Sequence, residues 1–213
     1  MNLTKYGIKE DNKLLSIALT HSSYANEHKC YDYERLEFLG DAVLELVSSE
    51  YFYKNTNLKE GDMTKKRSSY VCEEALDEYA KSLNLKKYIK VGNGIEPNPT
   101  IIADVFEAVI AAIYLTSGLN KAREFILDNM VPYIEKDIKF LSDYKSYLQE
   151  LVQTDQKTIE YRVIKESGPS HNRYFEVEVI IDNITYAKGS GKSKKAAEQD
   201  AAKKAIELSA GVK

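Results

Sequence analysis

The segment 100–118 is apolar along almost its whole length, and its only charged residues are Asp104 and Glu107. A helix that is apolar nearly all round is normally buried in a protein core. The spacing of three places both carboxylates on one helix face, together with Ala108 and Ala111, whose small size would let another helix approach closely. Buried carboxylates are costly unless they are paired or bind a metal. The segment therefore predicts a central helix whose acidic face needs either a basic partner from elsewhere or a bound cation.

Helical spacing extends through most of the first 140 residues. Apolar residues recur three and four positions apart, and Gly and Pro residues fall between the runs. The pattern is interrupted around 140–145. We therefore expect an all-α domain at 1–140, a linker at 141–145 and a second domain at 146–213. The helices predicted for the first domain are 14–20, 33–52, 63–83, 100–117 and 120–139.

The second domain has a different periodicity. Apolar and polar residues alternate over 174–181, which is the period of a half-buried strand, and 159–165 and 184–188 are two further strand candidates. A short helix is expected at 147–153, and a longer one, rich in Ala and Lys, at 193–208. The predicted order of this domain is helix, three strands, helix, which is an α-β-β-β-α arrangement.

The net charge of −3 is unevenly divided along the chain. From Tyr144 onward there are 12 Lys and Arg residues against 10 Asp and Glu, which leaves 18 basic and 23 acidic residues before that point. Such an asymmetry says more about binding partners than the total charge does. The acidic first domain is where cations would collect.

The chain shows no sign of export or of membrane insertion. Its first residues contain no long apolar stretch, which argues against a signal peptide, and no window reaches 18 uninterrupted apolar residues. The two cysteines, Cys30 and Cys72, lack the CxxC spacing of a zinc site and support no disulfide framework. We therefore expect a cytoplasmic protein with reduced thiols and no membrane partner.

A second acidic face is predicted in the helix at 33–52. At 100° per residue, Glu34, Glu37 and Asp41 lie within one narrow sector, opposite the apolar residues of that helix. A solvated polar surface is one explanation. However, like charges four residues apart are mildly destabilising unless something offsets them. A cation site is therefore the other explanation of this acidic face.

Together the two acidic helices would supply four carboxylates: Glu37, Asp41, Asp104 and Glu107. Ligands that are all oxygen suit Mg²⁺ or Mn²⁺. A di-iron helical bundle would need a Glu-x-x-His motif, and none of the three histidines follows a Glu by three residues in these helices. A magnesium site built from carboxylates alone indicates phosphoryl chemistry, in which the metal activates water and neutralises the leaving oxygen.

The sequence YERLEFLGDAVL at 33–44 resembles the signature helix of bacterial ribonuclease III. Three other segments resemble the same family in the expected order: LTHSSYANE at 19–27, EGDM at 60–63 and IADVFEA at 102–108. The resemblance covers nearly the whole chain. It implies an all-α ribonuclease III domain followed by a small double-stranded RNA-binding domain.

The resemblance also implies roles for individual residues. Asp41 and Glu107 are the residues whose loss catalysis would tolerate least, and Phe38 matches an aromatic residue at the family's homodimer contact. The implied product ends are a 5′-phosphate and a 3′-hydroxyl with a short 3′ overhang. Processing of ribosomal RNA precursors and other structured transcripts is the implied role, with no organic cofactor. The implied metal ligands are Glu37, Asp41, Asp104 and Glu107, and the implied accessory acidic residues are Glu34 and Glu60.

The second domain resembles the double-stranded RNA-binding domain that follows the nuclease domain in this family. Such domains recognise the shape of A-form RNA, largely without reading its sequence. Ser193 is a plausible N-cap, so the helix after it would direct backbone N–H groups and a positive dipole at a phosphate. The residues implied in RNA contact are Gln149 and Glu150, His171 within the loop Gly168-Pro169-Ser170-His171-Asn172, and Lys192, Lys194 and Lys195.

One segment departs from the family pattern, because residues 91–103 lack the basic residues that often precede the second acidic helix. A different class of function was also weighed: a regulator that binds double-stranded RNA without cutting it. Loss of a metal ligand would mark such a protein. All four ligand positions hold carboxylates in this sequence, which favours the enzyme.

Overall fold

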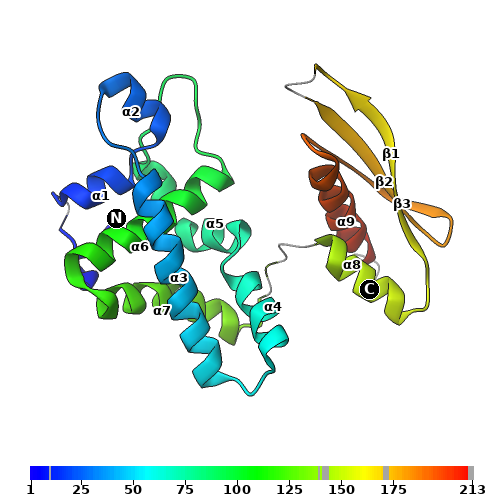
Figure 1. The fold of residues 1–213 in the computed structure, drawn as a ribbon, viewed down its shortest axis with the longest axis horizontal. Coiled ribbons are helices and arrows are strands. Elements are labelled where there is room, and N and C mark those ends of the chain that lie inside the picture. Colours follow the sequence, from blue (N-terminus) through cyan, green and yellow to red (C-terminus); the bar gives the residue numbers. More distant parts are fainter. Residues whose placement is uncertain (10, 139, 141–143, 170–172, 211–213) are drawn as a thin grey trace. The chain divides into compact units, whose positions relative to one another are not determined.

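The computed structural model describes residues 1–9, 11–138, 140, 144–169 and 173–210, and the chain divides into two compact units (Figure 1). Met1–Ser142 is called the N-terminal unit below and Asp143–Lys213 the C-terminal unit. In the described residues, the named secondary-structure elements of the N-terminal unit are all helices, as the apolar spacing predicts. Its elements are η1 (Thr4–Tyr6), α1 (Lys13–Ala18), α2 (Ser22–His28), α3 (Glu34–Asn55), α4 (Glu60–Tyr70), α5 (Glu73–Ser82), η2 (Leu85–Tyr88), α6 (Pro99–Ser117) and α7 (Leu119–Glu135).

The apolar helix α6 is the centre of the N-terminal unit, with α1, α3, α5 and α7 packed around it (Figure 1). Its start is set by Asn98, whose side chain accepts a hydrogen bond from the Ile101 N–H at 2.9 Å, and by Pro99 in the first turn. Its end is set by Gly118, at φ 81°. Within the described residues, α6 is the one helix long and apolar enough to cross a membrane, but here those apolar side chains form the core.

The prediction of one helix over 63–83 is wrong, because the structure has two helices, α4 and α5, in that region. The chain leaves helical geometry at Val71 and becomes extended at Cys72, with ψ 164°. Tyr70 is buried at the end of α4, and Leu76 and Tyr79 are buried from α5. The break turns the second half of the segment so that both halves bury their apolar residues in the same core.

Helix α2 was not predicted, since it is only seven residues long and mostly polar. His21 begins it, and the His21 Nδ1 accepts a hydrogen bond from the Ser23 N–H at 3.1 Å. Helix α7 ends at Glu135, four residues before the predicted end, and Lys139 lies outside the described residues.

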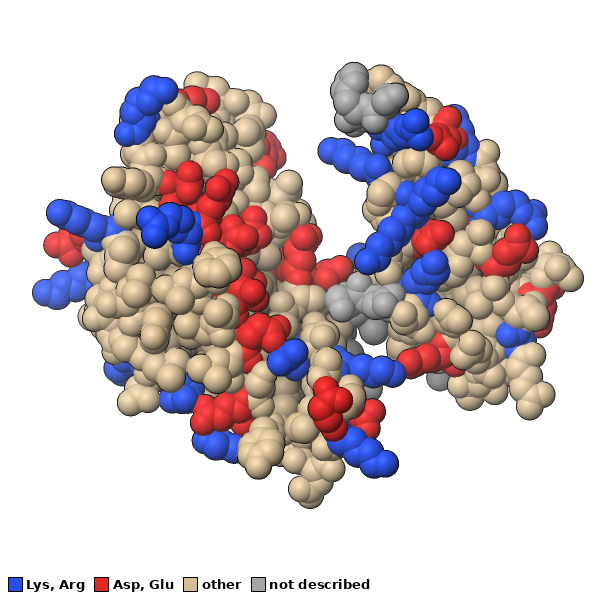
Figure 2. Space-filling model, in the orientation of Figure 1, with Lys and Arg blue, Asp and Glu red and all other residues tan. Residues whose placement is uncertain are grey.

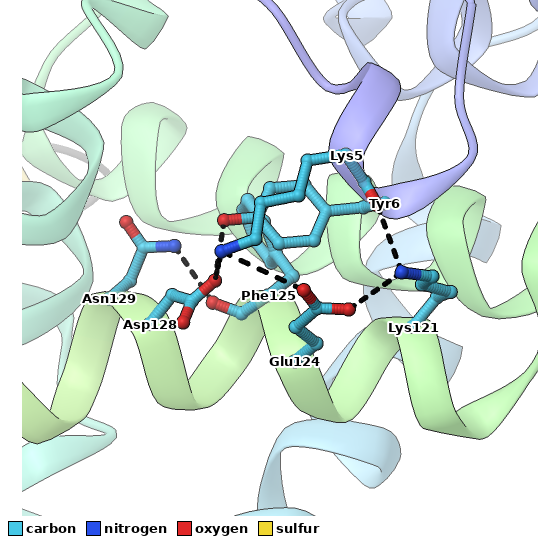
Figure 3. Close-up of polar contacts among 7 residues, drawn as sticks. All are labelled: Lys5, Tyr6, Lys121, Glu124, Phe125, Asp128 and Asn129. Carbon is cyan, nitrogen blue, oxygen red and sulfur yellow. Dashed lines mark hydrogen bonds and ion pairs between the residues drawn. The ribbon is translucent and has the colours of Figure 1, made fainter.

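The N-terminal 3-10 helix η1 packs against α7 and makes polar contacts with it (Figure 3). The ring of Tyr6 meets Phe125 edge-on at 5.1 Å between centroids. The Tyr6 hydroxyl donates to Asp128 Oδ2 at 2.9 Å, and Lys5 Nζ lies 2.6 Å from the same oxygen. Lys121 Nζ donates to the Lys5 carbonyl at 3.0 Å. These contacts hold the first residues of the chain against α7 at the edge of the apolar core.

The C-terminal unit has the predicted order of helix, three strands and helix. The strands form one antiparallel sheet in the order β1-β2-β3, and α8 and α9 pack together. Gly189 and Gly191 on β3 lie so close to the α9 backbone that neither has room for a Cβ. The two glycines therefore let α9 bury its alanines on the sheet. The elements are α8 (Tyr144–Thr154), β1 (Ile159–Ser167), β2 (Tyr174–Ile181), β3 (Ile184–Gly191) and α9 (Lys194–Ala210).

Candidate active site and RNA-binding surface

Helices α3 and α6 come into close contact at Gly40. A Cβ at this position would overlap the backbone carbonyl of Glu107, so only glycine allows the two backbones to lie this close. The contact brings the acidic faces of the two helices together. On α3, Glu37 is half-buried and Asp41 is exposed, whereas on α6 both Asp104 and Glu107 are half-buried.

The carboxylates form one electrostatic cluster. Burial raises the pKa of Glu107 to about 8, and the nearby charges of Asp41, Glu37 and Asp104 act in the same direction. The pKa of Glu37 is raised by burial first and then by Asp104, Glu34 and Asp41. Such shifts show that the negative charges are close enough to repel one another without full screening by water.

No ion pair offsets this repulsion in the part of the chain that is described. No described Lys, Arg or His lies within ion-pair distance of Glu37, Asp41, Asp104 or Glu107. Burial raises the pKa of Asp104, and the hydrogen bond from Tyr33 and the nearby His21 offset that increase only in part. A basic partner for the α6 carboxylates, the alternative that the sequence left open, is therefore not found there. Figure 2 shows acidic side chains gathered in a band along α3.

The chemistry of these donors fits a hard divalent cation, because all four are carboxylates and none forms an ion pair with a described residue. Among the described residues, no group of three or more His, Cys, Asp or Glu side chains is arranged so that it could hold a metal ion. The two helices bring the four carboxylates near enough to interact electrostatically, and their mutual repulsion favours separation when no cation is bound.

Two residues that the sequence did not single out belong to this cluster. Glu45 adds to the charge that raises the pKa of Glu107. It lies one helical turn after Asp41, so the four-residue spacing was a signal that could have found it. Tyr33 donates a hydrogen bond from its hydroxyl to Asp104 Oδ2 at 3.1 Å. No local pattern could have shown that contact, because it joins residues 71 positions apart.

The two accessory acidic residues behave differently. Glu34 is exposed on α3 and contributes to the raised pKa of Glu37. Glu60 is exposed in the first turn of α4 and accepts a hydrogen bond from the Thr64 hydroxyl at 3.2 Å. It is not among the charges that raise the pKa of Glu37, Asp104 or Glu107. The structure thus joins Glu34 to the cluster and leaves Glu60 apart from it.

Phe38 is 82% exposed on α3, beside the acidic residues in sequence. Leu46 and Tyr53 on the same helix are also large and exposed, at 55% and 75%. Exposed apolar side chains on one element mark an interaction surface more often than isolated ones do.

The C-terminal unit presents the predicted lysines at the start of α9. Lys192, Lys194 and Lys195 are all exposed. The Ser193 hydroxyl accepts a hydrogen bond from the Ala196 N–H at 3.1 Å, which confirms the predicted cap. Figure 2 shows basic side chains gathered over this part of the C-terminal unit.

The other predicted RNA contacts are only partly visible. Gln149 and Glu150 are exposed on α8, which packs against α9. Gly168 directly follows β1 and has φ 89°, in the region that favours glycine. His171, with its neighbours Ser170 and Asn172, lies outside the described residues.

Comparisons with known proteins agree with both units. The ribonuclease-III-like family pattern matches residues 11–134, and the double-stranded RNA binding motif matches residues 144–208. Ribonuclease 3 from Clostridium tetani is 50% identical over 214 residues, covering 95% of this chain and 91% of that protein. Ribonuclease 3 from Streptococcus pneumoniae TIGR4 is 46% identical over 208 residues, covering 92% and 90%.

Among solved structures, the nuclease domain of ribonuclease III from Campylobacter jejuni is similar to this chain, with 40% identity and a TM-score of 0.54. The match covers 64% of this chain and 93% of that one. A second structure of the same domain, with the same TM-score, is described as showing flexibility in a region involved in dimer formation. With a nuclease pattern over the helical unit and an RNA-binding motif over the unit that follows, the chain belongs to the ribonuclease III family.

Proposed function

We propose that this protein is a magnesium-dependent endonuclease that hydrolyses double-stranded RNA. The observation that carries the proposal is the cluster of four carboxylates on α3 and α6, which has no ion-pair partner in the described residues. The double-stranded RNA-binding motif in the same chain supports the substrate class. A partly buried acidic cluster of this kind is most stable when a cation neutralises it.

Four residues would hold the cation: Glu37, Asp41, Asp104 and Glu107, with Mn²⁺ as a possible substitute for Mg²⁺. A bound Mg²⁺ would supply water activation, orientation of the scissile phosphate and neutralisation of the leaving oxygen. Glu107 is the most perturbed of the four, because its carboxylate is buried among like charges. Its loss, and that of Asp41, should be tolerated least. The attacking water forms the new P–O bond, the P–O3′ bond breaks, and the products carry a 5′-phosphate and a 3′-hydroxyl.

The enzyme would act as a homodimer, with one cleavage site in each subunit and one strand cut by each. Phe38 supports this proposal, because a phenylalanine that is 82% exposed gains most from burial against a second copy. Two offset cuts would leave the short 3′ overhang. Glu34 and Glu60 would line the surface around the site, Glu34 next to the cluster and Glu60 farther away along α4.

The C-terminal unit would bind the duplex mainly through contacts to the RNA phosphate backbone. The capped start of α9, with Lys192, Lys194 and Lys195, suits a phosphate group. Gln149 and Glu150 on α8, together with His171, would contact the adjacent minor grooves. Contacts of these kinds recognise A-form shape, so selection among transcripts would depend on RNA structure more than on sequence.

The cellular role we propose is the processing of ribosomal RNA precursors and other structured transcripts in the cytoplasm. Cys30 and Cys72 are both free thiols in the structure, which suits a reducing compartment.

The test is incubation of the purified protein and Mg²⁺ with a long perfect RNA duplex, with single-stranded RNA and duplex DNA as controls. Short RNA duplexes with 5′-phosphates, and no cleavage of the controls, are expected. Binding of the duplex without cleavage, in either Mg²⁺ or Mn²⁺, would show instead a regulator that only binds double-stranded RNA.

A further inference from the structure

Tyr33 is the one described side chain that hydrogen-bonds to any of the four proposed metal ligands. Its hydroxyl donates to Asp104 Oδ2 at 3.1 Å. Tyr33 precedes the first residue of α3, while Asp104 is in the first half of α6, so the bond joins the two helices that carry the site. Tyr33 is only 4% exposed, and its ring belongs to the N-terminal core.

The backbone and ring of Tyr33 are both held in place by the segment before α2. The Tyr33 N–H donates to the Thr20 carbonyl at 3.0 Å. The imidazole of His21 lies 5.7 Å from the Tyr33 ring, centroid to centroid, at 56° between planes. The hydroxyl of Tyr33 therefore reaches Asp104 from a fixed position.

His21 is itself fixed by Ser23. Its Nδ1 accepts a hydrogen bond from the Ser23 N–H at 3.1 Å and lies 2.7 Å from the Ser23 hydroxyl. That hydroxyl accepts from the Gly92 N–H at 2.9 Å, which leaves its own hydrogen to donate to Nδ1. With Nδ1 used as an acceptor, a neutral His21 ring carries its proton on Nε2. The chain Gly92–Ser23–His21 thus sets the orientation of the ring beside Tyr33.

A hydroxyl that donates to one oxygen of a carboxylate restricts its rotation and leaves the second oxygen available to a cation. Partners of this kind, behind the ligands themselves, commonly change metal affinity 10- to 100-fold when they are removed. A tyrosine hydroxyl ordinarily keeps its proton near neutral pH, so Tyr33 can act as the donor. Glu37 and Glu107 have no comparable donor in the described residues.

We propose that Tyr33 is a positioning residue for the metal site: it orients the Asp104 carboxylate toward a divalent cation and is itself oriented by His21. The inference rests on the proposed function, because it assumes that Asp104 is a ligand. It goes beyond that function because it assigns part of the site's affinity for the metal to Tyr33, which is not itself a ligand.

The experiment measures binding of Mn²⁺ alone to the full-length, RNA-free protein, by electron paramagnetic resonance. Tyr33→Phe removes the hydroxyl and keeps the buried ring, and should weaken Mn²⁺ binding by about 10-fold or more. Tyr24→Phe is the matched control, since Tyr24 is a half-buried tyrosine on α2 whose ring stacks on His28 at 3.8 Å. Tyr24→Phe should bind Mn²⁺ like the wild type.

A double-mutant cycle shows whether Tyr33 acts through Asp104. In an Asp104→Ala background, adding Tyr33→Phe should cause no further loss of Mn²⁺ affinity. In cleavage assays, Tyr33→Phe should raise the Mg²⁺ concentration needed for half-maximal rate and change the rate at saturating Mg²⁺ little. If Tyr33 had a purely structural role, Tyr33→Phe would also lower the cleavage rate at saturating Mg²⁺.

Wild-type affinity in Tyr33→Phe would overturn the inference and leave the proposed function standing, provided the wild type binds Mn²⁺ and cuts RNA. An equal loss in Tyr24→Phe, or a further loss on top of Asp104→Ala, would also overturn it. A wild type that neither binds Mn²⁺ nor cuts RNA would overturn the proposed function together with the inference.

Discussion

Gly40 on α3 lies directly against the backbone carbonyl of Glu107 on α6, in a space that has no room for a Cβ. The most perturbed carboxylate of the site thus sits where the two helices are closest. The same contact that builds the core of the N-terminal unit therefore concentrates the negative charge. Both the packing of α3 on α6 and the position of Glu107 in the acidic cluster depend on Gly40.

Gly40→Ala should separate α3 from α6. Overpacking of a tight contact costs about 1–3 kcal/mol, so the free energy of unfolding measured in urea should fall by that amount. Gly61→Ala is the control, because Gly61 is also within a helix but has nothing within 4 Å of a built Cβ. Alanine is the better helix former, so Gly61→Ala should be neutral or stabilising. Equal stability of Gly40→Ala and the wild type would show that the helices can move apart without cost.

Glu107 should make the metal-free protein less stable as the pH rises. Its pKa is about 8 in the folded protein, above the ordinary 4.5, so the folded state holds the proton more tightly than the unfolded state does. The contribution of Glu107 to the free energy of unfolding is therefore fully present below about pH 4.5. It is lost as the pH rises toward 8. Glu107→Gln should remove this dependence and be more stable than the wild type at pH 8 by at least about 1 kcal/mol.

The control for that comparison is Glu124→Gln. The pKa of Glu124 is lowered by its hydrogen bond to Lys121, so removing this carboxylate should not increase stability at pH 8. Thermal unfolding in a chelating buffer, followed by addition of Mg²⁺, is the measurement. Mg²⁺ should stabilise the wild type and have a smaller effect on Glu107→Gln. A wild type as stable as Glu107→Gln at pH 8 would contradict the electrostatic description.

Phe38→Ala should convert the protein from dimer to monomer in sedimentation experiments, with little change in unfolding temperature. The side chain is exposed in the single chain, so its removal leaves no cavity in the core. Ile184→Ala removes another apolar side chain, 63% exposed on the C-terminal unit, and should leave the assembly unchanged. A Phe38→Ala protein that remains dimeric would place the interface elsewhere.

Replacing Lys192, Lys194 and Lys195 by alanine should weaken duplex binding and make it less sensitive to salt. Log affinity falls with log salt, and each lysine that neutralises a phosphate makes that fall steeper by roughly 0.7–0.9. In the triple variant the slope should therefore be less steep by about 2. The control is Lys203→Ala with Lys204→Ala on the same helix, where Lys204 pairs with Asp200 and Lys203 lies over Tyr144. An unchanged salt slope in the triple variant would exclude the start of α9 from the RNA-binding surface.

Composition and spacing predicted the parts of this fold that are determined locally. The apolar segment around Asp104 and Glu107 had to be a buried helix, and alternation over 174–181 had to be a strand. The cap at Ser193 followed from one residue before a helical run. The break at Val71 and Cys72 could not be predicted, because apolar residues at helical spacing continue on both sides of it.

The site was predictable only as far as its residues share a helix face. Glu37 and Asp41 lie on one face of α3 because of spacing alone, but their distance from α6 depends on Gly40. The bond from Tyr33 to Asp104 depends on how the segment before α2 is held, which no local pattern encodes. The assignment of the four carboxylates as metal ligands stays a prediction.

The most direct test compares wild type and Glu107→Gln on one long RNA duplex, with binding and cleavage measured in the same Mg²⁺ buffer. We predict that both proteins bind the duplex with similar affinity, that the wild type cuts it to short products, and that Glu107→Gln is slower by at least about 100-fold. Cleavage by Glu107→Gln at the wild-type rate would contradict the proposed metal site and place the chemistry outside the α3–α6 cluster.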